Sequence, residues 1–281
     1  MKTLLSTLTL AFVFSANAQN FKGKAIYKTS MKSNFKISAE NNPGMDENMQ
    51  EEIRKRMQKM NQKTYVLEFN KYNSTYTQKV SLDAPKTSIG KISPIIMSFG
   101  GSGNSSIYYK NIQEKRFVNQ TEIMGKLFLV KDKLPEHPWK LSSETKHIGN
   151  YTCYKATYSK EVENKNITFK DGDSVESIKK ETIVTTAWYT PQIPVSNGPG
   201  TYQGLPGLIL EINDGKKVFV CTEIILNSSE KTNILEPTKG KIVSQNKFIK
   251  IQKEKSDELM EKFKGRNGLD LGNGINIKIG G

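Results

Sequence analysis

The sequence is poor in the residues from which most recognisable catalytic and metal sites are built. Its 281 residues include only two histidines and two cysteines, and these do not recur at the spacing that a zinc site requires. It also lacks the G-x-S-x-G turn of many serine hydrolases and the Lys-Ser/Thr ending of a phosphate-binding loop. His137 is interpreted as an exposed or hydrogen-bonded loop residue. We therefore expect no metal and no cofactor, and a non-catalytic role is favoured over an enzymatic one.

Long apolar runs are absent beyond the N-terminus. Residues 1–18 combine Lys2, a short apolar stretch and the sequence Ala16-Asn17-Ala18, a pattern typical of a secretory signal peptide that is cleaved after Ala18. The apolar stretch is too short to cross a bilayer, and no later segment is long and apolar enough to do so. The sequence predicts a secreted or periplasmic protein, which could associate with the outer membrane and has no transmembrane segment.

Acidic residues are fewer than basic ones, and the formal net charge is +14. Such a charge can attract nucleic acids, lipid phosphates or acidic polysaccharides. However, the lysines are spread along the chain without a compact run of five, as is typical of solvated strand faces. Together with the predicted export, this distribution argues against a nucleic-acid partner.

Strand patterns dominate the rest of the chain. In residues 21–32 apolar side chains alternate with lysines, as in a strand with one buried and one wet face. Short runs of the same kind recur up to Leu226, with turn residues between them. We predict a single mainly β domain over residues 19–264. Its fold is expected to be a curved antiparallel sheet or half-barrel with one or two helices, similar by fold-level analogy to periplasmic lipoprotein-carrier half-barrels.

Two segments are predicted to be helices on the concave face of this sheet. Residues 46–62 carry acidic residues early, basic residues late and a stripe of methionines, which suits an amphipathic helix. The stripe contains Met49, Met57 and Met60. It is interpreted as an apolar face or lid, and binding of Cu(I) by the thioethers is the alternative. Residues 252–264 form the second predicted helix, and the Gly/Asn-rich residues 265–281 are predicted to be a flexible tail.

The two cysteines, Cys153 and Cys221, each lie in a predicted strand. An even number of cysteines in an oxidising compartment suggests a disulfide. This bridge would close a loop of about 70 residues and restrict the unfolded chain. The alternative is a pair of buried, inert thiols.

The densest cluster of prolines and glycines lies between Ala187 and Ile212. A strand ends at Trp188-Tyr189, a loop with four prolines and four glycines follows, and an apolar strand begins at Leu208. Prolines fix φ and glycines permit positive φ, so this loop is predicted to be rigid. It is interpreted as a structural corner that closes the curved sheet or, alternatively, as a recognition surface. The candidate binding residues are Trp188, Tyr189, Tyr202, Leu205 and Pro206, together with Met49, Met57 and Met60.

This region resembles the GLPGLI family, a Bacteroidetes family of exported proteins whose function is not established. The naming hexapeptide is present as Gly204-Leu205-Pro206-Gly207-Leu208-Ile209. Further positions that match the family pattern are Trp139, Leu141, Thr145, Lys146, Ile148, Tyr151, Cys153, Lys155, Ala156, Trp188, Tyr189, Ile193, Pro194, Gly198 and Pro199. The resemblance runs from about Phe21 to about Asn227 and implies a secreted or periplasmic location, but no activity.

Three functional hypotheses follow. The first is a non-catalytic binding protein for a lipid or another apolar or amphipathic ligand, or for an outer-membrane protein, because export and a curved sheet coincide with the lack of a catalytic set. The second is an extracellular hydrolase of peptide or glycan whose acid and base meet only in three dimensions. The third is copper or other metal handling by the methionine-rich helix predicted over residues 46–62.

Overall fold

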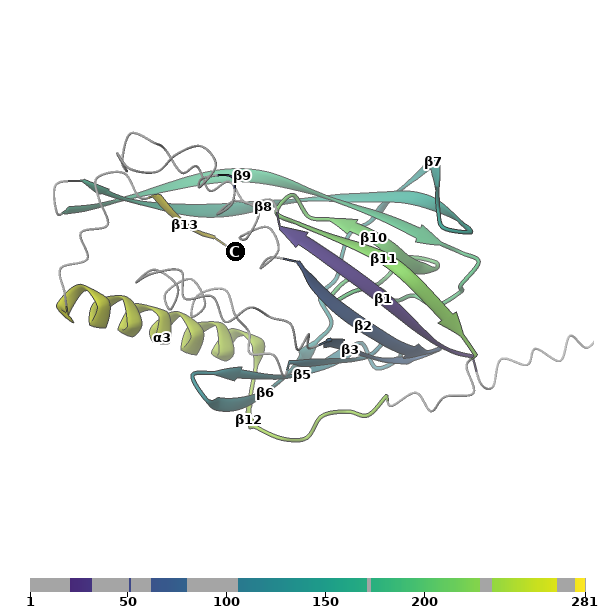
Figure 1. The fold of residues 1–281 in the computed structure, drawn as a ribbon, viewed down its shortest axis with the longest axis horizontal. Coiled ribbons are helices and arrows are strands. Elements are labelled where there is room, and N and C mark those ends of the chain that lie inside the picture. The colour runs from purple at the N-terminus through teal and green to yellow at the C-terminus, as the bar shows by residue number, and fades with distance from the viewer. Residues whose placement is uncertain are drawn as a thin grey trace, which may run out of the picture.

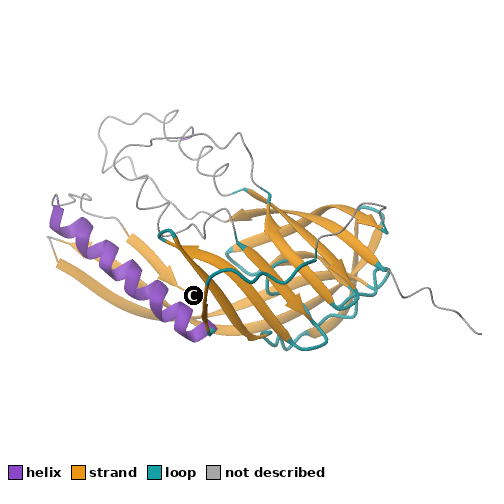
Figure 2. Ribbon diagram, turned by 90° about the horizontal axis from the view of Figure 1, so that it is seen from below, coloured by secondary structure: helices purple, strands orange, loops and turns teal. Residues whose placement is uncertain are grey.

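The computed structural model describes residues 21–31, 51, 62–79, 106–170, 173–227, 234–266 and 276–280. These residues form an open, curved sheet with one full helix, α3 (Gln245–Arg266) (Figures 1 and 2). The strands are β1 (Lys22–Met31), β2 (Lys63–Asn70), β3 (Asn73–Gln78), β4 (Ile107–Asn111), β5 (Arg116–Ile123), β6 (Lys126–Lys133), β7 (Lys140–Ile148), β8 (Tyr151–Lys170), β9 (Asp173–Thr190), β10 (Leu208–Asn213), β11 (Lys217–Leu226), β12 (Lys241–Val243) and β13 (Asn276–Gly280). The prediction of a mainly β, curved antiparallel sheet is confirmed.

The strand order shows how the sheet is assembled. It runs β12-β6-β5-β4-β3-β2-β1-β11-β10-β9-β8-β13, and β7 pairs with β8 off this path. Every pairing is antiparallel except that of β12 with β6. The long hairpin of β8 and β9 extends beyond the rest of the sheet in both views, at the end of the molecule where α3 lies (Figures 1 and 2). Half of the twelve pairs between the described strands join consecutive strands separated by at most four residues, whereas β1 and β11 meet from distant parts of the chain.

The inner face of the sheet carries the main core. We use this name for the face on which Tyr27, Leu67 and Tyr76 lie buried, as the alternation along β1, β2 and β3 predicts. Side chains from β8, β9 and β10, including Ala156, Ala187 and Ile212, join the same cluster. Each large apolar side chain buried in this way contributes about 1.5–3 kcal/mol to the stability of the fold. The curved shape of the sheet is therefore stabilised by the side chains that it encloses.

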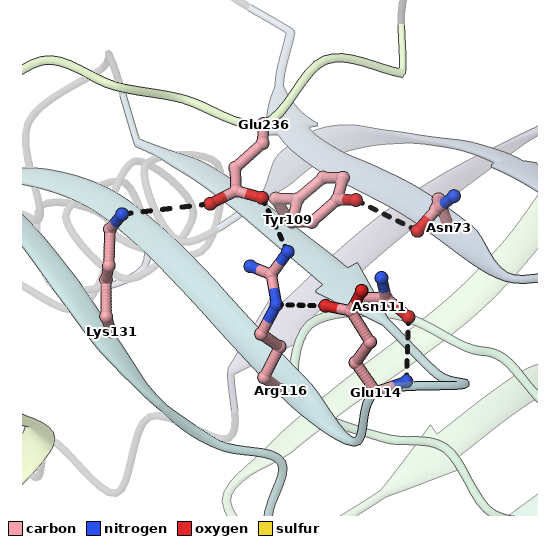
Figure 3. A network of polar contacts seen from close by, with 7 residues as sticks. All are labelled: Asn73, Tyr109, Asn111, Glu114, Arg116, Lys131 and Glu236. Atoms are coloured by element: carbon pink, nitrogen blue, oxygen red, sulfur yellow. Dashed lines mark hydrogen bonds and ion pairs between the residues drawn. The ribbon is translucent and has the colours of Figure 1, made fainter.

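The outer face of β4, β5 and β6 is crossed by residues 234–240. Ile234 packs on a small cluster of Tyr109, Val118 and Leu129. The Glu236 carboxylate lies 2.8 Å from an Arg116 nitrogen and 3.8 Å from Lys131 Nζ (Figure 3). The same network includes Glu114, which pairs with Arg116, and Tyr109 Oη, which donates to Asn73 Oδ1 at 2.9 Å. We call residues 234–240 the strap.

The strap leads around the β6 edge and delivers α3 to the inner face. Gly240 turns with a φ of +124°, and β12 then pairs in parallel with β6. Helix α3 begins where Gln245 N–H donates to Asp132 Oδ2 at 3.0 Å, and Ser244 accepts from the next turn, so both serve as N-terminal caps. Phe248 then packs against Phe128, with ring centroids 5.6 Å apart. The strap and α3 therefore pack on opposite faces of the sheet at the β6 edge.

The helix predicted over residues 252–264 is present as the C-terminal part of α3, which starts at Gln245. The predicted signal peptide and most of the helix predicted over residues 46–62 lie outside the described residues. Within the predicted tail, residues 276–280 form β13, which pairs with β8. No helix in the described ranges is long and apolar enough to cross a membrane.

Gly240→Ala tests how β12 is held. A Cβ at this position would approach the carbonyl carbon of Phe128 to 2.7 Å, and the φ of +124° is one that side chains resist. We expect a loss of unfolding free energy of at least ~2 kcal/mol. Gly125→Ala is the matched control, because Gly125 also has a positive φ (+78°) but an added Cβ there would meet no atom within 4 Å. Equal urea-unfolding midpoints for the two variants would contradict the close approach.

Candidate functional site

The proline- and glycine-rich segment between β9 and β10 folds onto the inner face. We call residues 191–207 the inner loop. Its apolar side chains Ile193, Val195 and Leu205 are buried in the main core. The backbone is tied to β10, since Leu208 N–H donates to Ile193 O at 3.0 Å and Ile209 N–H donates to Asn197 O at 2.9 Å. The loop is therefore part of the core rather than a projecting arm.

Lys110 of β4 holds the inner loop with a completely buried amine. Its Nζ donates to the carbonyl of Gly198 at 2.7 Å and to that of Tyr202 at 3.2 Å. No carboxylate forms an ion pair with it within the described part of the chain. Desolvation lowers the pKa of Lys110 to about 7, because burial penalises the charged form. Full burial leaves no path for a substrate, so the amine acts as a support for the loop.

The linker between β6 and β7 meets the same loop from the other side. His137 Nε2 lies 3.2 Å from Thr201 O, and Trp139 Nε1 donates to Gln203 O at 2.9 Å. Burial lowers the pKa of His137, and Lys110 adds to the effect. Because the linker joins strands from opposite ends of the sheet order, the inner loop and linker together bridge the open sheet.

An aromatic cluster forms where the loop and linker touch. The His137 ring stacks on Tyr158 and Tyr202 with centroid distances of 5.2 and 5.4 Å. Trp139 meets Tyr158 edge-on at 4.8 Å, and Tyr202 Oη donates to Asp214 Oδ2 at 3.1 Å. The sequence pattern predicts a loop position for His137, which is correct, but it does not reveal the partners because they lie on three separate segments.

The structure separates the predicted binding residues of the loop region. Tyr189 and Leu205 are buried in the core, Tyr202 is half-buried in the aromatic cluster, and Pro206 is exposed. Trp188 is not directed into that cluster. Its ring lies under Lys146 Nζ, 4.5 Å from the centroid. The predicted methionines, Met49, Met57 and Met60, lie outside the described residues.

Trp188 belongs to a separate contact between β7, β9 and β10. Lys146 Nζ sits over the indole and also lies 2.8 Å from Glu211 Oε2. A cation held by both a ring and a carboxylate is a stable cross-strand contact. This arrangement pairs the Lys146 amine with both of its neighbours without a ligand.

Cys153 and Cys221 are free, buried thiols in the same core cluster. Burial raises the pKa of Cys153 to about 11 and that of Cys221 to about 12. Both groups are therefore protonated at neutral pH and are poor nucleophiles. The disulfide stays a prediction for the protein in an oxidising compartment.

A row of tyrosines on the inner face of β2, β3 and β4 was not predicted from the sequence. Tyr65 stacks on Tyr76 with centroids 4.8 Å apart and planes at 7°. Tyr76 is the cross-strand partner of Tyr108, which stacks on Phe117 at 5.1 Å. We call Tyr65, Tyr76 and Tyr108 the tyrosine row. Their alternation with polar residues indicated strands but not that the three rings line up across them.

The tyrosine row and the neighbouring Ser74 contain buried hydroxyl groups that have no hydrogen-bond partner in the described part of the chain. Within the described residues, the buried hydroxyl oxygens of Ser74, Tyr76 and Tyr108 form no hydrogen bond. Burial raises the pKa of both tyrosines, so they stay protonated and keep a hydrogen to donate. A buried hydroxyl without a partner costs about 1–3 kcal/mol. The three lie on two paired strands, β3 and β4, and so many unpartnered donors in one place call for an explanation, of which a bound polar group is one.

The described residues contain no cluster of three or more His, Cys, Asp or Glu side chains with the proximity of a metal site. The two titratable nitrogens nearest the inner loop, Lys110 Nζ and His137 Nε2, are both engaged with backbone carbonyls.

Residues 139–211 match the model of a family described as a protein of unknown function (Porph_ging). No curated protein matches the chain. Among solved structures, the chain is similar to PNGF-II in C2 and P21 crystal forms, with 13% and 12% sequence identity and a TM-score of 0.47 for each. Both matches cover 84% of this chain but 33% and 34% of the PNGF-II chains, so the chain spans about a third of their length.

Lys110→Met tests the buried amine through the pH dependence of stability. The unfolded chain keeps this amine protonated up to its ordinary pKa of 10.5, whereas the folded chain releases the proton near pH 7. The unfolding free energy of the wild type relative to the variant should therefore rise with pH between these values, by about 1 kcal/mol per pH unit. Urea unfolding of both proteins at pH 6 to 9 measures it, and a pH-independent difference would refute the burial of a titrating amine.

Thiol labelling tests the state of Cys153 and Cys221. We expect no reaction with iodoacetamide in the native protein at pH 8, because both thiols are buried and protonated. Unfolding in urea without a reductant then separates the two predicted states by mass. Free cysteines take up the label, whereas a disulfide does not. Rapid labelling of the native protein would show that the core is not closed around them.

Proposed function

We propose that this chain is an exported, non-catalytic binding protein of the GLPGLI type that holds an amphipathic ligand on the inner face of its sheet. The observation that carries the proposal is the tyrosine row, in which the hydroxyls of Tyr76 and Tyr108, like that of the neighbouring Ser74, have no partner among the described residues. Aromatic rings provide apolar contact at low entropy cost, and hydroxyl donors fix the orientation of a polar group. An amphipathic molecule satisfies both needs at once, whereas a purely apolar one leaves the hydroxyls without partners.

The GLPGLI part of the proposal is supported by its motifs, which lie in the block that matches the Porph_ging family model. That block, residues 139–211, contains Trp139, the Tyr151-to-Ala156 segment and the Gly204-to-Ile209 hexapeptide. Export rests on the signal-peptide pattern of residues 1–18.

The binding proposal is better supported than a hydrolase. Acid–base catalysis needs groups within hydrogen-bond reach of a reacting atom. Lys110 and His137 instead contact carbonyls of the inner loop, and Asp214 accepts the Tyr202 hydroxyl. The methionines on which the copper hypothesis depends lie outside the described residues, so no contact favours that hypothesis.

Organic extraction of the protein purified from its native host tests the proposal. We expect native mass spectrometry to show a bound amphipathic molecule, and extraction to release it. The Tyr76→Phe, Tyr108→Phe double variant should carry about tenfold less of it, since each lost hydrogen bond to a ligand costs about 0.5–1.5 kcal/mol, while its stability is unchanged or higher.

Tyr109→Phe is the matched control for that double variant. Tyr109 is next in sequence to Tyr108 but lies on the outer face, where its hydroxyl donates to Asn73. Its loss should lower the unfolding free energy by about 1 kcal/mol and leave the bound ligand unchanged. An apo mass for the wild type, or equal ligand content in all three proteins, would reject the proposed function.

A further inference from the structure

A half-buried lysine lies at one end of the tyrosine row. Lys217, the first residue of β11, places its Nζ 5.1 Å from the centroid of the Phe219 ring and 5.9 Å from that of the Tyr65 ring. Both rings stabilise the cation through their π-electrons. Tyr65 is the first member of the tyrosine row, so the amine and the row form a continuous surface.

Lys217 has no anionic partner in the part of the chain that the structure describes. The nearest candidate, Asp214, is committed to other donors: Oδ2 accepts from Tyr202 Oη, and Oδ1 accepts from the backbone N–H groups of Lys216 and Lys217. Burial lowers the pKa of Lys217 and the positive charge of Lys63 lowers it further, whereas Asp214 partly offsets both. Two cations thus share this end of the row, and an added negative charge would relieve their repulsion.

The surface continues from Lys217 across adjacent strands. The sheet order β11-β1-β2-β3-β4 places Lys217 at one end and Tyr108 at the other. The Lys217 amine reaches to within 5.9 Å of the Tyr65 ring on β2, and two further strand spacings of about 5 Å each lead from β2 to β4. The resulting length of about 15 Å suits a single extended acyl chain. The unpartnered Tyr76 hydroxyl lies between the two ends, and it is an independent sign that something polar is received along this surface.

We infer that the ligand is an amphipathic anion whose acidic group lies against Lys217 and whose apolar body runs along Tyr65, Tyr76 and Tyr108. This inference rests on the proposed function and specifies the charge and orientation of its ligand. A single-chain carboxylate and a single-chain phosphate share the required chemistry. The lysine supplies a charge-assisted hydrogen bond, which is about twice as strong as a neutral one, and the rings supply the apolar contact.

Displacement of the neutral fluorescent probe N-phenyl-1-naphthylamine measures the charge preference. Laurate, dodecyl phosphate and dodecanol, each below its micelle concentration, are compared as competitors. We expect at least one of the two anions to bind about tenfold more tightly than dodecanol, and the better anion identifies the head group. Equal affinity for all three competitors would overturn the inference.

Variants of Lys217 assign the preference to this residue. Lys217→Met should bring the affinity for the anions down to that for dodecanol without changing dodecanol binding, and Lys217→Arg should retain the preference. Lys140→Met is the matched control, because Lys140 is an exposed lysine of β7 and its loss removes the same charge elsewhere. If Lys140→Met weakens anion binding as much as Lys217→Met does, the preference is a net-charge effect and the inference is wrong.

The two proposals fail in different ways. If the naphthylamine probe does not bind the wild type, the proposed binding function itself is refuted. If the probe binds but the Lys217 variants treat anions as the wild type does, only the assignment of the anion site is refuted. Urea unfolding of Lys217→Met and Lys217→Arg confirms that a loss of binding is not a loss of folding.

Discussion

The structure depends on how an open sheet covers its own inner face. A closed barrel satisfies its edges and core together, whereas this sheet must bring in other segments to exclude water. The inner loop does so, and the buried amine of Lys110 fixes it through two carbonyls. Burial of this amine without a counter-charge is costly for its charged form, which is why its pKa falls to about 7. It is tolerated because the carbonyls of Gly198 and Tyr202 would otherwise be buried without a donor.

The contact of Lys110 with the inner loop helps to position the aromatic cluster around His137. Once the loop is held, Tyr202 reaches His137 and Phe219, and Trp139 closes on Gln203. The rings of the tyrosine row pack differently, since Tyr65 stacks on Tyr76 and Tyr108 stacks on Phe117. The two aromatic groups therefore differ in kind: one joins segments of the chain, and the other is a surface with unused hydrogen-bond donors.

The sequence predicted the strands and the sheet class because alternation is a local property, as in β1, where lysines alternate with apolar residues. It also located the C-terminal part of α3, although the start at Gln245 depends on Asp132, which is more than 100 residues away. It did not reveal Lys110, which looks like an ordinary solvent-facing lysine in Ser106–Ile112 and is buried only because a loop some 90 residues later folds over it. The tyrosine row was missed for the same reason, since its register is set by pairing between strands.

The pairing of β1 with β11 has a kinetic consequence. Strands β1 to β6 follow one another as neighbours, and so do β7 to β11, so each block can assemble from contacts that are close in sequence. The two blocks join where Gly23 meets Leu226, two residues that are about 200 positions apart in the sequence. The pairing of β1 with β11 closes a loop of about 200 residues, so we expect it to be slow and to follow the assembly of both blocks. Until then the β1 edge is an exposed template for pairing with another chain, so the last folding step is also the one most open to aggregation.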